Sequence, residues 1–148
     1  MLELISDESW AQIAVDDDAS RIIVTWKGFA LTEELCQTLT QATAVIREHR
    51  TATYLADCRL RRAVPPDGQA WMVDVWFPKV LRSGILHKMA IVLPERSIAR
   101  TNMGAIIGQV SGRDFASRSF EGLEAAVAWL DEDGSDAGVV DASTTPRR

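Results

Sequence analysis

The fold is decided by residues 21–58, which read RIIVTWKGFALTEELCQTLTQATAVIREHRTATYLADC. The segment begins with the β-branched and aromatic residues 21–26, a composition typical of a strand, and Gly28 follows them as a breaker. From Thr32 onward, two glutamates lie in the first turn of a helix whose apolar residues recur at helical spacing, namely Leu35, Leu39, Ala42 and Ile46. The short apolar run at 54–58 ends on polar side chains, as a buried parallel strand does where it meets solvent. The order predicts a strand–helix–strand unit with a right-handed crossover.

The same alternation continues along the chain. Phe115 is expected to begin the last of four β-α units, whose earlier members begin at Arg21, Tyr54 and Lys88. Pro78 falls inside a helical pattern, and because proline removes a backbone donor we expect a kink or restart at residues 76–78. The expected strands are 2–6, 10–15, 21–26, 54–58, 88–93 and 115–120, and the expected helices are 32–50, 66–84, one from Ser97 to Gly108 or Gly112, and 123–130.

The chain has the size and composition of one ordinary domain, with 148 residues, 47% of them hydrophobic and 25% charged. We expect residues 1–130 to form that domain and the acidic stretch 131–148 to be a disordered tail. The predicted fold class is α/β, with a mixed, mostly parallel sheet, antiparallel strands at its N-terminal edge and helices packed on it.

Charge and segment composition limit the function classes. The net charge of −5 argues against nucleic-acid binding, because the one basic cluster, Arg59, Arg61 and Arg62, is small for such a role. The acidic N-terminus does not resemble a signal peptide, and no apolar run reaches the roughly 20 residues that span a bilayer. We therefore expect a cytoplasmic protein with no membrane insertion. Cys36 and Cys58 are expected to be reduced and mostly buried.

Several short blocks of the sequence occur in a familiar order: WKGF at 26–29, LADCR at 55–59, WFP at 76–78, AIVLP at 90–94, and Phe120 ahead of AA at 125–126 and WL at 129–130. In these blocks the chain resembles the SpoIIAA-like group of STAS domains, and more closely the small stand-alone bacterial proteins labelled STAS/SEC14-like. The resemblance covers roughly residues 2–130. It implies a four-turn β-α superhelix over a mixed sheet.

For function, the resemblance implies less. Members of the wider family act as anti-sigma factor antagonists. Phosphorylation switches them at a Ser or Thr that follows an Asp at the start of the second core helix. Here Asp57 ends the strand, but no Ser or Thr occurs from Leu55 to Val80, so the sequence departs from that pattern. The SEC14 part of the label implies an apolar ligand pocket by analogy of fold.

No catalytic or metal-binding pattern emerges, and we predict no enzyme activity, no cofactor and no metal site. His49 and His87 are best explained as structural residues at a helix end and a strand start. The glycines at 104, 108 and 112 favour close helix packing over phosphate binding, since no Lys-Ser or Lys-Thr follows them. The acidic run 16–18 lacks the spacing of a calcium loop.

The second β-α junction is the candidate binding site, because ligands of α/β sheets gather beyond the carboxyl ends of the strands. Large aromatics beside Arg are also common in interaction hot spots. Two readings remain open there: a partner or ligand surface, or a local Asp57–Arg59 ion pair with both Trp in the core. The candidate residues are Asp57, Cys58, Arg59, Arg61, Trp71 and Trp76.

Three hypotheses follow for function. The first is a non-catalytic module that binds a protein partner or forms a homodimer. The second is a carrier or sensor of a small apolar ligand, held between the second and third helices and the sheet, and the third is an enzyme that uses Asp57 or Cys58. The lining expected for the carrier is Met72, Trp76, Phe77, Met103 and Ile107.

Overall fold

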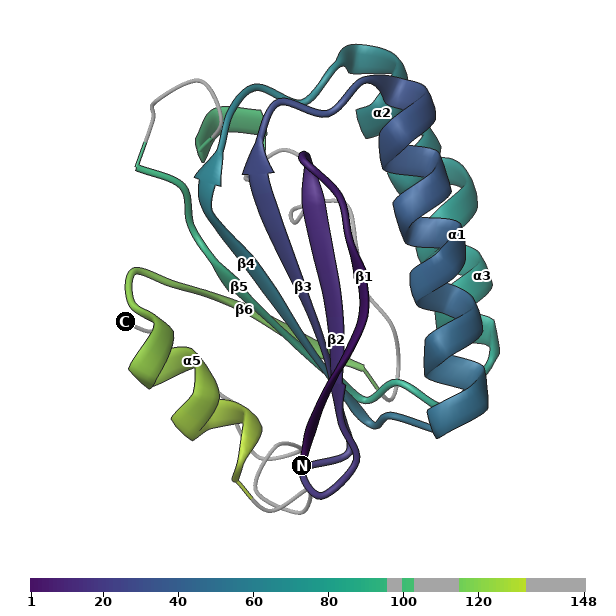
Figure 1. Cartoon of the computed structure of the whole chain (residues 1–148), viewed down its shortest axis with the longest axis vertical. Helices are drawn as coiled ribbons and strands as arrows, with labels where there is room; N and C mark the ends of the chain where they lie inside the picture. The colour runs from purple at the N-terminus through teal and green to yellow at the C-terminus, as the bar shows by residue number, and fades with distance from the viewer. Residues whose placement is uncertain (96–99, 103–114, 133–148) are drawn as a thin grey trace.

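The computed structural model of this chain describes residues 1–95, 100–102 and 115–132, and shows a single six-stranded sheet with helices on both faces (Figure 1). The strands lie in the sheet in the same order as in the sequence. They are β1 (Leu2–Asp7), β2 (Ala11–Asp16), β3 (Arg21–Gly28), β4 (Thr53–Arg61), β5 (Lys88–Val92) and β6 (Ala116–Phe120). The helices are α1 (Thr32–His49), α2 (Pro66–Trp71), the π-helical turn η1 (Met72–Trp76), α3 (Phe77–Arg82) and α5 (Leu123–Leu130).

The sheet is mixed, as the sequence predicts. β1, β2 and β3 pair antiparallel, and β3, β4, β5 and β6 pair parallel. The expected α/β fold class is therefore confirmed: antiparallel strands stand at the N-terminal edge and a parallel sheet follows. Within the part of the chain that the structure describes, no helix is both long and apolar enough to cross a membrane.

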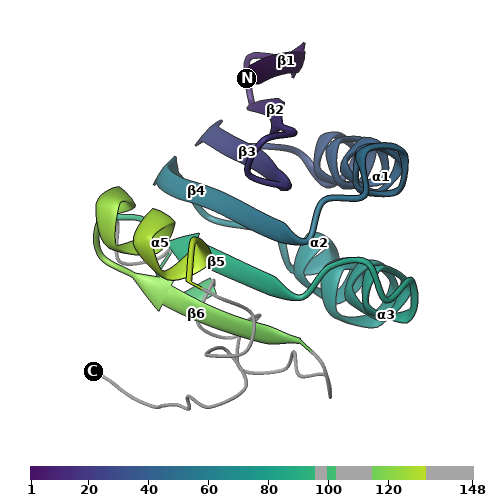
Figure 2. The same cartoon turned by 90° about the horizontal axis from the view of Figure 1, so that it is seen from below.

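The two faces of the sheet are covered unequally. Figure 2 shows α1 and the α2–η1–α3 segment along one face, and α5 on the other. The larger core cluster lies under the first group of helices, where the predicted stripe Leu35, Leu39, Ala42 and Ile46 of α1 is buried. A smaller cluster lies under α5 and contains Leu55, Ala90, Val92, Ala126, Trp129 and Leu130.

The second helix differs from a single proline-kinked helix. The chain from Pro66 to Arg82 runs as α2, then one π-helical turn, then α3 from Phe77. Pro78 occupies the first turn of α3, directly after the π-helical turn, and the N–H of Phe77 reaches back to the carbonyl of Met72. A kink or restart was expected at 76–78; there the helix type changes at Phe77 while the backbone stays helical, and the π-helical turn is the feature that the sequence pattern did not predict.

The strand β4 is longer than expected. A loop was predicted from Arg59, but β4 continues to Arg61. Its register against β3 shifts between Thr25 and Lys27, so one additional β4 residue is accommodated before pairing resumes. The strand continues because β3 supplies partners for it, which a local reading of the sequence cannot detect. The helix predicted from Ser97 lies outside the described residues, except that residues 100–102 are helical.

Candidate functional site

The carboxyl end of β4 projects beyond its neighbour β5. The pairing of β4 with β5 ends at Asp57 and Val92, whereas its pairing with β3 continues to Gly28 and Arg61. The backbone N–H of Arg62 then donates to the carbonyl oxygen of Gly28 at 2.9 Å and extends the contact by one residue. This end of the parallel strands is where α/β proteins commonly bind ligands, and it contains most of the residues that the sequence singled out.

Asp57 and Arg59 form a local ion pair. The Asp57 carboxylate is 8% exposed and accepts hydrogen bonds from the backbone N–H of Arg59 at 3.2 Å, from its Nε at 2.9 Å and from its Nη2 at 2.8 Å. A buried carboxylate is costly unless it is paired in this way. The Arg59 side chain is 46% exposed, so the guanidinium is fixed on one side and reaches solvent on the other. The local pair, one of the two readings of the sequence, is present.

The neighbouring Cys58 and Arg61 point into the core. The guanidinium carbon of Arg61 lies 4.1 Å from the centroid of the Trp26 ring, which places a buried cation over an aromatic face. Burial raises the pKa of the Cys58 thiol, and the charge of Arg61 opposes that rise in part. Burial also raises the pKa of Tyr54 and lowers that of Arg61. Because a nucleophilic cysteine must be a thiolate that solutes can reach, this environment does not favour reaction at Cys58.

The two tryptophans of the candidate site have different surroundings. Trp76 is buried, and its Nε1–H donates to the carbonyl oxygen of Leu39 and to Oγ1 of Thr43, both at 3.0 Å. Trp71 is half-buried and packs against the large core cluster. Arg59 and part of Trp71 thus reach the surface. The buried members of the set are Asp57, Cys58, Arg61 and Trp76, and a binding role for the set stays a prediction.

The lining predicted for an apolar carrier is described only in part. Met72, Trp76 and Phe77 are buried members of the large core cluster. The ring of Trp76 contacts that of Phe77 edge to face, with centroids 4.7 Å apart. Met103 and Ile107 lie outside the described residues.

Exposed apolar side chains surround the same end of the sheet, and the sequence analysis did not identify them. Phe29 is 49% exposed, Leu31 54% and Leu60 69%. Gly28 pairs with Arg61, and Phe29 is the next residue after Gly28. Phe29 therefore lies at the end of β3, one position beyond Arg61 in register. The available signal was an apolar residue directly after a glycine breaker and another between two arginines. We call the carboxyl end of β3 and β4, with the loop that leads to α1, the carboxyl rim; its exposed residues are Phe29, Leu31, Arg59, Leu60 and Arg62.

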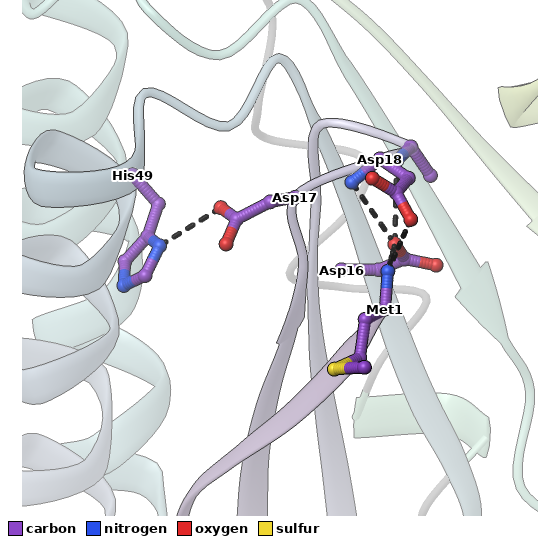
Figure 3. A network of polar contacts seen from close by, with 6 residues as sticks. Met1, Asp16, Asp17, Asp18 and His49 are labelled. Carbon is purple, nitrogen blue, oxygen red and sulfur yellow. Dashed lines mark hydrogen bonds and ion pairs between the residues drawn. The ribbon is translucent and has the colours of Figure 1, made fainter.

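The acidic turn and His49 lie away from the carboxyl rim, at the opposite end of the strands. Figure 3 shows Asp17 pointing toward His49, whose Nδ1 is 2.9 Å from the Asp17 carboxylate, while Asp16 and Asp18 turn toward the amino group of Met1. Asp16 also accepts the backbone N–H groups of Asp18 at 3.1 Å and Ala19 at 3.3 Å. These carboxylates therefore fix the β2–β3 turn. Among the described residues, no cluster of three His, Cys, Asp or Glu side chains could hold a metal ion.

Comparisons with known proteins add evidence on the fold. No family model matches the chain, and no curated protein matches its sequence. SiaC of Pseudomonas aeruginosa is similar in structure, with a TM-score of 0.50, 13% sequence identity, and coverage of 81% of this chain and 99% of that chain. Identity this low is evidence for the fold alone. The likeness supports the expected SpoIIAA-like arrangement: a six-stranded mixed sheet, antiparallel at its N-terminal edge and then parallel, with helices packed on it.

Proposed function

We propose that this chain is a non-catalytic interaction module that binds a protein partner through the carboxyl rim. The observation that carries the proposal is the exposure of three large apolar side chains, Phe29, Leu31 and Leu60, around one end of the sheet. Several large apolar side chains exposed together, with polar residues at their border, commonly mark an interaction site, whereas single exposed ones do not. Here Arg59 and Arg62 border it, and Arg is enriched at protein interfaces.

The local geometry favours binding over chemistry. The only carboxylate that the sequence placed at this junction, Asp57, is neutralised by Arg59, and the adjacent thiol of Cys58 is enclosed. The Arg59 guanidinium is held by two side-chain bonds to Asp57 while its outer side meets solvent, so it is already ordered before a partner arrives. Such ordering reduces the entropy that an interface residue loses on binding.

The test compares the wild type with two variants that carry the same substitution at opposite ends of the sheet. Leu60→Glu places a charge in the carboxyl rim. Leu2→Glu is the control, because Leu2 is 60% exposed against 69% for Leu60 but belongs to the amino end of the sheet, where it pairs with Asp16. Each protein, checked for folding by circular dichroism, is immobilised and used to capture partners, and the recovered proteins are quantified by mass spectrometry.

We expect the wild type and Leu2→Glu to recover the same partners in equal amounts. Leu60→Glu should recover at least about tenfold less of them, since losing the burial of one Leu side chain costs about 1.5–3 kcal/mol. Native mass spectrometry of the same three proteins covers self-association, where the dimer of the wild type would disappear in Leu60→Glu. Equal recovery by both variants would contradict a role for the rim. A small molecule that copurifies in the native spectrum would favour the carrier hypothesis instead.

A further inference from the structure

Of the described helices α1, α2, α3 and α5, only α5 lies on its face of the sheet, as Figure 2 shows. Among the described residues, the cluster between α5 and the sheet contains six buried residues, three of them from α5 itself, whereas the cluster on the opposite face contains twenty-three. The helix is only eight residues long, and Gly122, the residue that precedes it, provides no side-chain cap. Helices shorter than about 12–15 residues have little stability of their own, so α5 depends on its contacts with the sheet.

Two cations from the amino ends of the parallel strands anchor the last turn of α5. Nζ of Lys88 in β5 donates to the carbonyl oxygen of Trp129 at 2.8 Å and to that of Glu132 at 3.4 Å, and it lies 4.8 Å from the centroid of the Trp129 ring. Nη2 of Arg21 in β3 lies 2.6 Å from the Asp131 carboxylate. Cations at this end of a helix bind its unpaired carbonyl groups and favour its dipole.

The connection to β6 allows α5 to move without the strand. The carbonyl oxygen of Phe120 accepts the backbone N–H of Leu93 at 2.9 Å, and the next residue, Glu121, is paired with Arg100 at 2.9 Å. Gly122 alone separates this anchored point from Leu123, and space around its Cα is open. A rotation of the backbone at Gly122 would therefore lift α5 while β6 stays in the sheet.

Hydration of the two cations beneath α5 offsets part of the cost of breaking their contacts with the helix. The side chains of Arg21 and Lys88 are both buried in the closed state, and buried cations recover hydration when they are exposed. Arg21 also keeps its bond from Nε to Oγ1 of Thr53, at 3.1 Å, because both residues belong to the sheet. Opening thus exposes a small apolar area and hydrates two charges, whereas global unfolding exposes the whole of the large core.

We propose that α5 is a latch that opens and closes independently of global unfolding and that its opening uncovers a binding shelf on the sheet. The shelf consists of the apolar side chains Leu55, Ala90 and Val92, with Arg21 and Lys88 at one end. The shelf fits an amphipathic helix whose last carbonyl groups contact Lys88 and whose following carboxylate contacts Arg21, as α5 and Asp131 do in the closed state. The latch lies on the face away from α1 and goes beyond the function proposed for the carboxyl rim.

Native-state hydrogen exchange on the full chain tests the latch. A substitution in the large core lowers the free energy of global unfolding. It does not change the free energy of lifting α5, because the large core stays intact when α5 is lifted. The core variant is Leu39→Ala, in α1 on the opposite face. In the wild type, the amides of 123–130 should exchange at least about tenfold faster than those of 53–58. In Leu39→Ala, exchange at 53–58 should accelerate by about thirtyfold or more while exchange at 123–130 stays unchanged.

A second variant acts on the latch itself. Lys88→Met keeps the length of the side chain but removes the donor to Trp129 and Glu132, so exchange at 123–130 should accelerate by about tenfold. Lys79→Met, in which an exposed lysine of α3 is replaced, is the control and should change neither segment. Ile46→Val replaces Leu39→Ala as the core variant if Leu39→Ala does not fold, and it should accelerate exchange at 53–58 by about two- to tenfold. The proposal is overturned if 123–130 and 53–58 exchange at equal rates in the wild type, or accelerate by equal factors in the core variant.

Discussion

The two cysteines of this chain are both free, but only Cys58 is fully enclosed. Cys58 belongs to β4, and its side chain lies in the large core cluster. Cys36 is on α1 and is partly exposed. Burial raises the pKa of both thiols, and at Cys58 it also blocks the approach of a reagent. The third hypothesis from the sequence, an enzyme using Cys58, requires the opposite environment.

Iodoacetamide should therefore alkylate Cys36 at least about tenfold faster than Cys58 in the folded protein, because Cys58 reacts only after the structure opens. Peptide mass spectrometry measures the two rates separately. In concentrated urea both thiols are exposed and the rates should converge, which is the internal control. Equal rates in the folded protein would mean that Cys58 is accessible.

His49 should titrate above the ordinary imidazole pKa of about 6.5. The hydrogen bond with Asp17 raises the pKa of His49 by stabilising the protonated ring. A folded-state pKa above the unfolded value means that the pair stabilises the fold fully at pH values below the unfolded pKa, and that this contribution is lost as the pH rises through the folded pKa. The pair is near the surface, so its contribution to stability is small.

Proton NMR titration of the His49 ring measures this pKa directly. Asp17→Asn should move the midpoint down toward the ordinary value, and Asp74→Asn, which removes an exposed carboxylate of η1, is the matched control and should leave it in place. An unchanged midpoint in Asp17→Asn would show that the carboxylate does not determine the protonation of His49.

At the scale of elements, Trp76 joins η1 to α1. Its indole N–H bonds to Leu39 and Thr43, one turn apart on α1, while its ring packs edge to face on Tyr54 of β4. Trp76→Phe should lower the free energy of unfolding by about 1–3 kcal/mol, since it removes a buried donor and part of an aromatic contact. Urea unfolding followed by circular dichroism measures the change.

The control for that substitution is Trp71→Phe, one helical turn earlier in α2. Trp71 is half-buried, so its replacement should cost less than that of Trp76. A larger loss at Trp71 would contradict the assignment of Trp76 as the aromatic link between the two helices.

The elements themselves were largely predictable from the sequence. Runs of β-branched, aromatic and apolar residues located the strands, and the stripe of α1 was buried as expected, because its helical spacing reports which face meets the core. What the pattern did not contain was the continuation of β4 to Arg61, which depends on its partner β3, and the π-helical turn before Phe77.

The sequence predicted where the candidate residues lie but not how each is oriented. Chain order put Asp57 and Cys58 at the end of a strand, and the structure has them in the last part of β4, yet Arg61 reads in sequence as a surface cation and lies in fact over the Trp26 ring. The shift in register beyond Thr25 determines which residues face the core, and a shift of one residue reverses the side chains that follow it. Leu60 is exposed for the same reason that Arg61 is buried.

At the scale of the whole molecule, the sheet has an apolar outer strand. Leu2 and Leu4 of β1 are largely exposed, and β1 pairs with β2 alone among the described strands. Its register shift between Leu4 and Ser6 and the charge of Glu3 are features that hinder pairing with another chain. A lysine at position 4 would strengthen that protection.

Leu4→Lys should raise the protein concentration at which light scattering appears on warming, while changing the free energy of unfolding by less than about 0.5 kcal/mol. The control is Val75→Lys, which places the same charge at an exposed apolar position of η1, outside both the sheet and the carboxyl rim. If both variants scatter light at the same concentration, the edge of β1 does not govern aggregation.

The agreement between strand order and chain order, described above for the fold, has a consequence for synthesis. Every described strand pairs with the strand that precedes it in sequence, so no pairing must wait for a distant segment of the chain. Loop-closure entropy grows with the length of chain between partners, and these partners are consecutive strands of the chain. As the polypeptide leaves the ribosome, each new strand can therefore join an edge that has already been made.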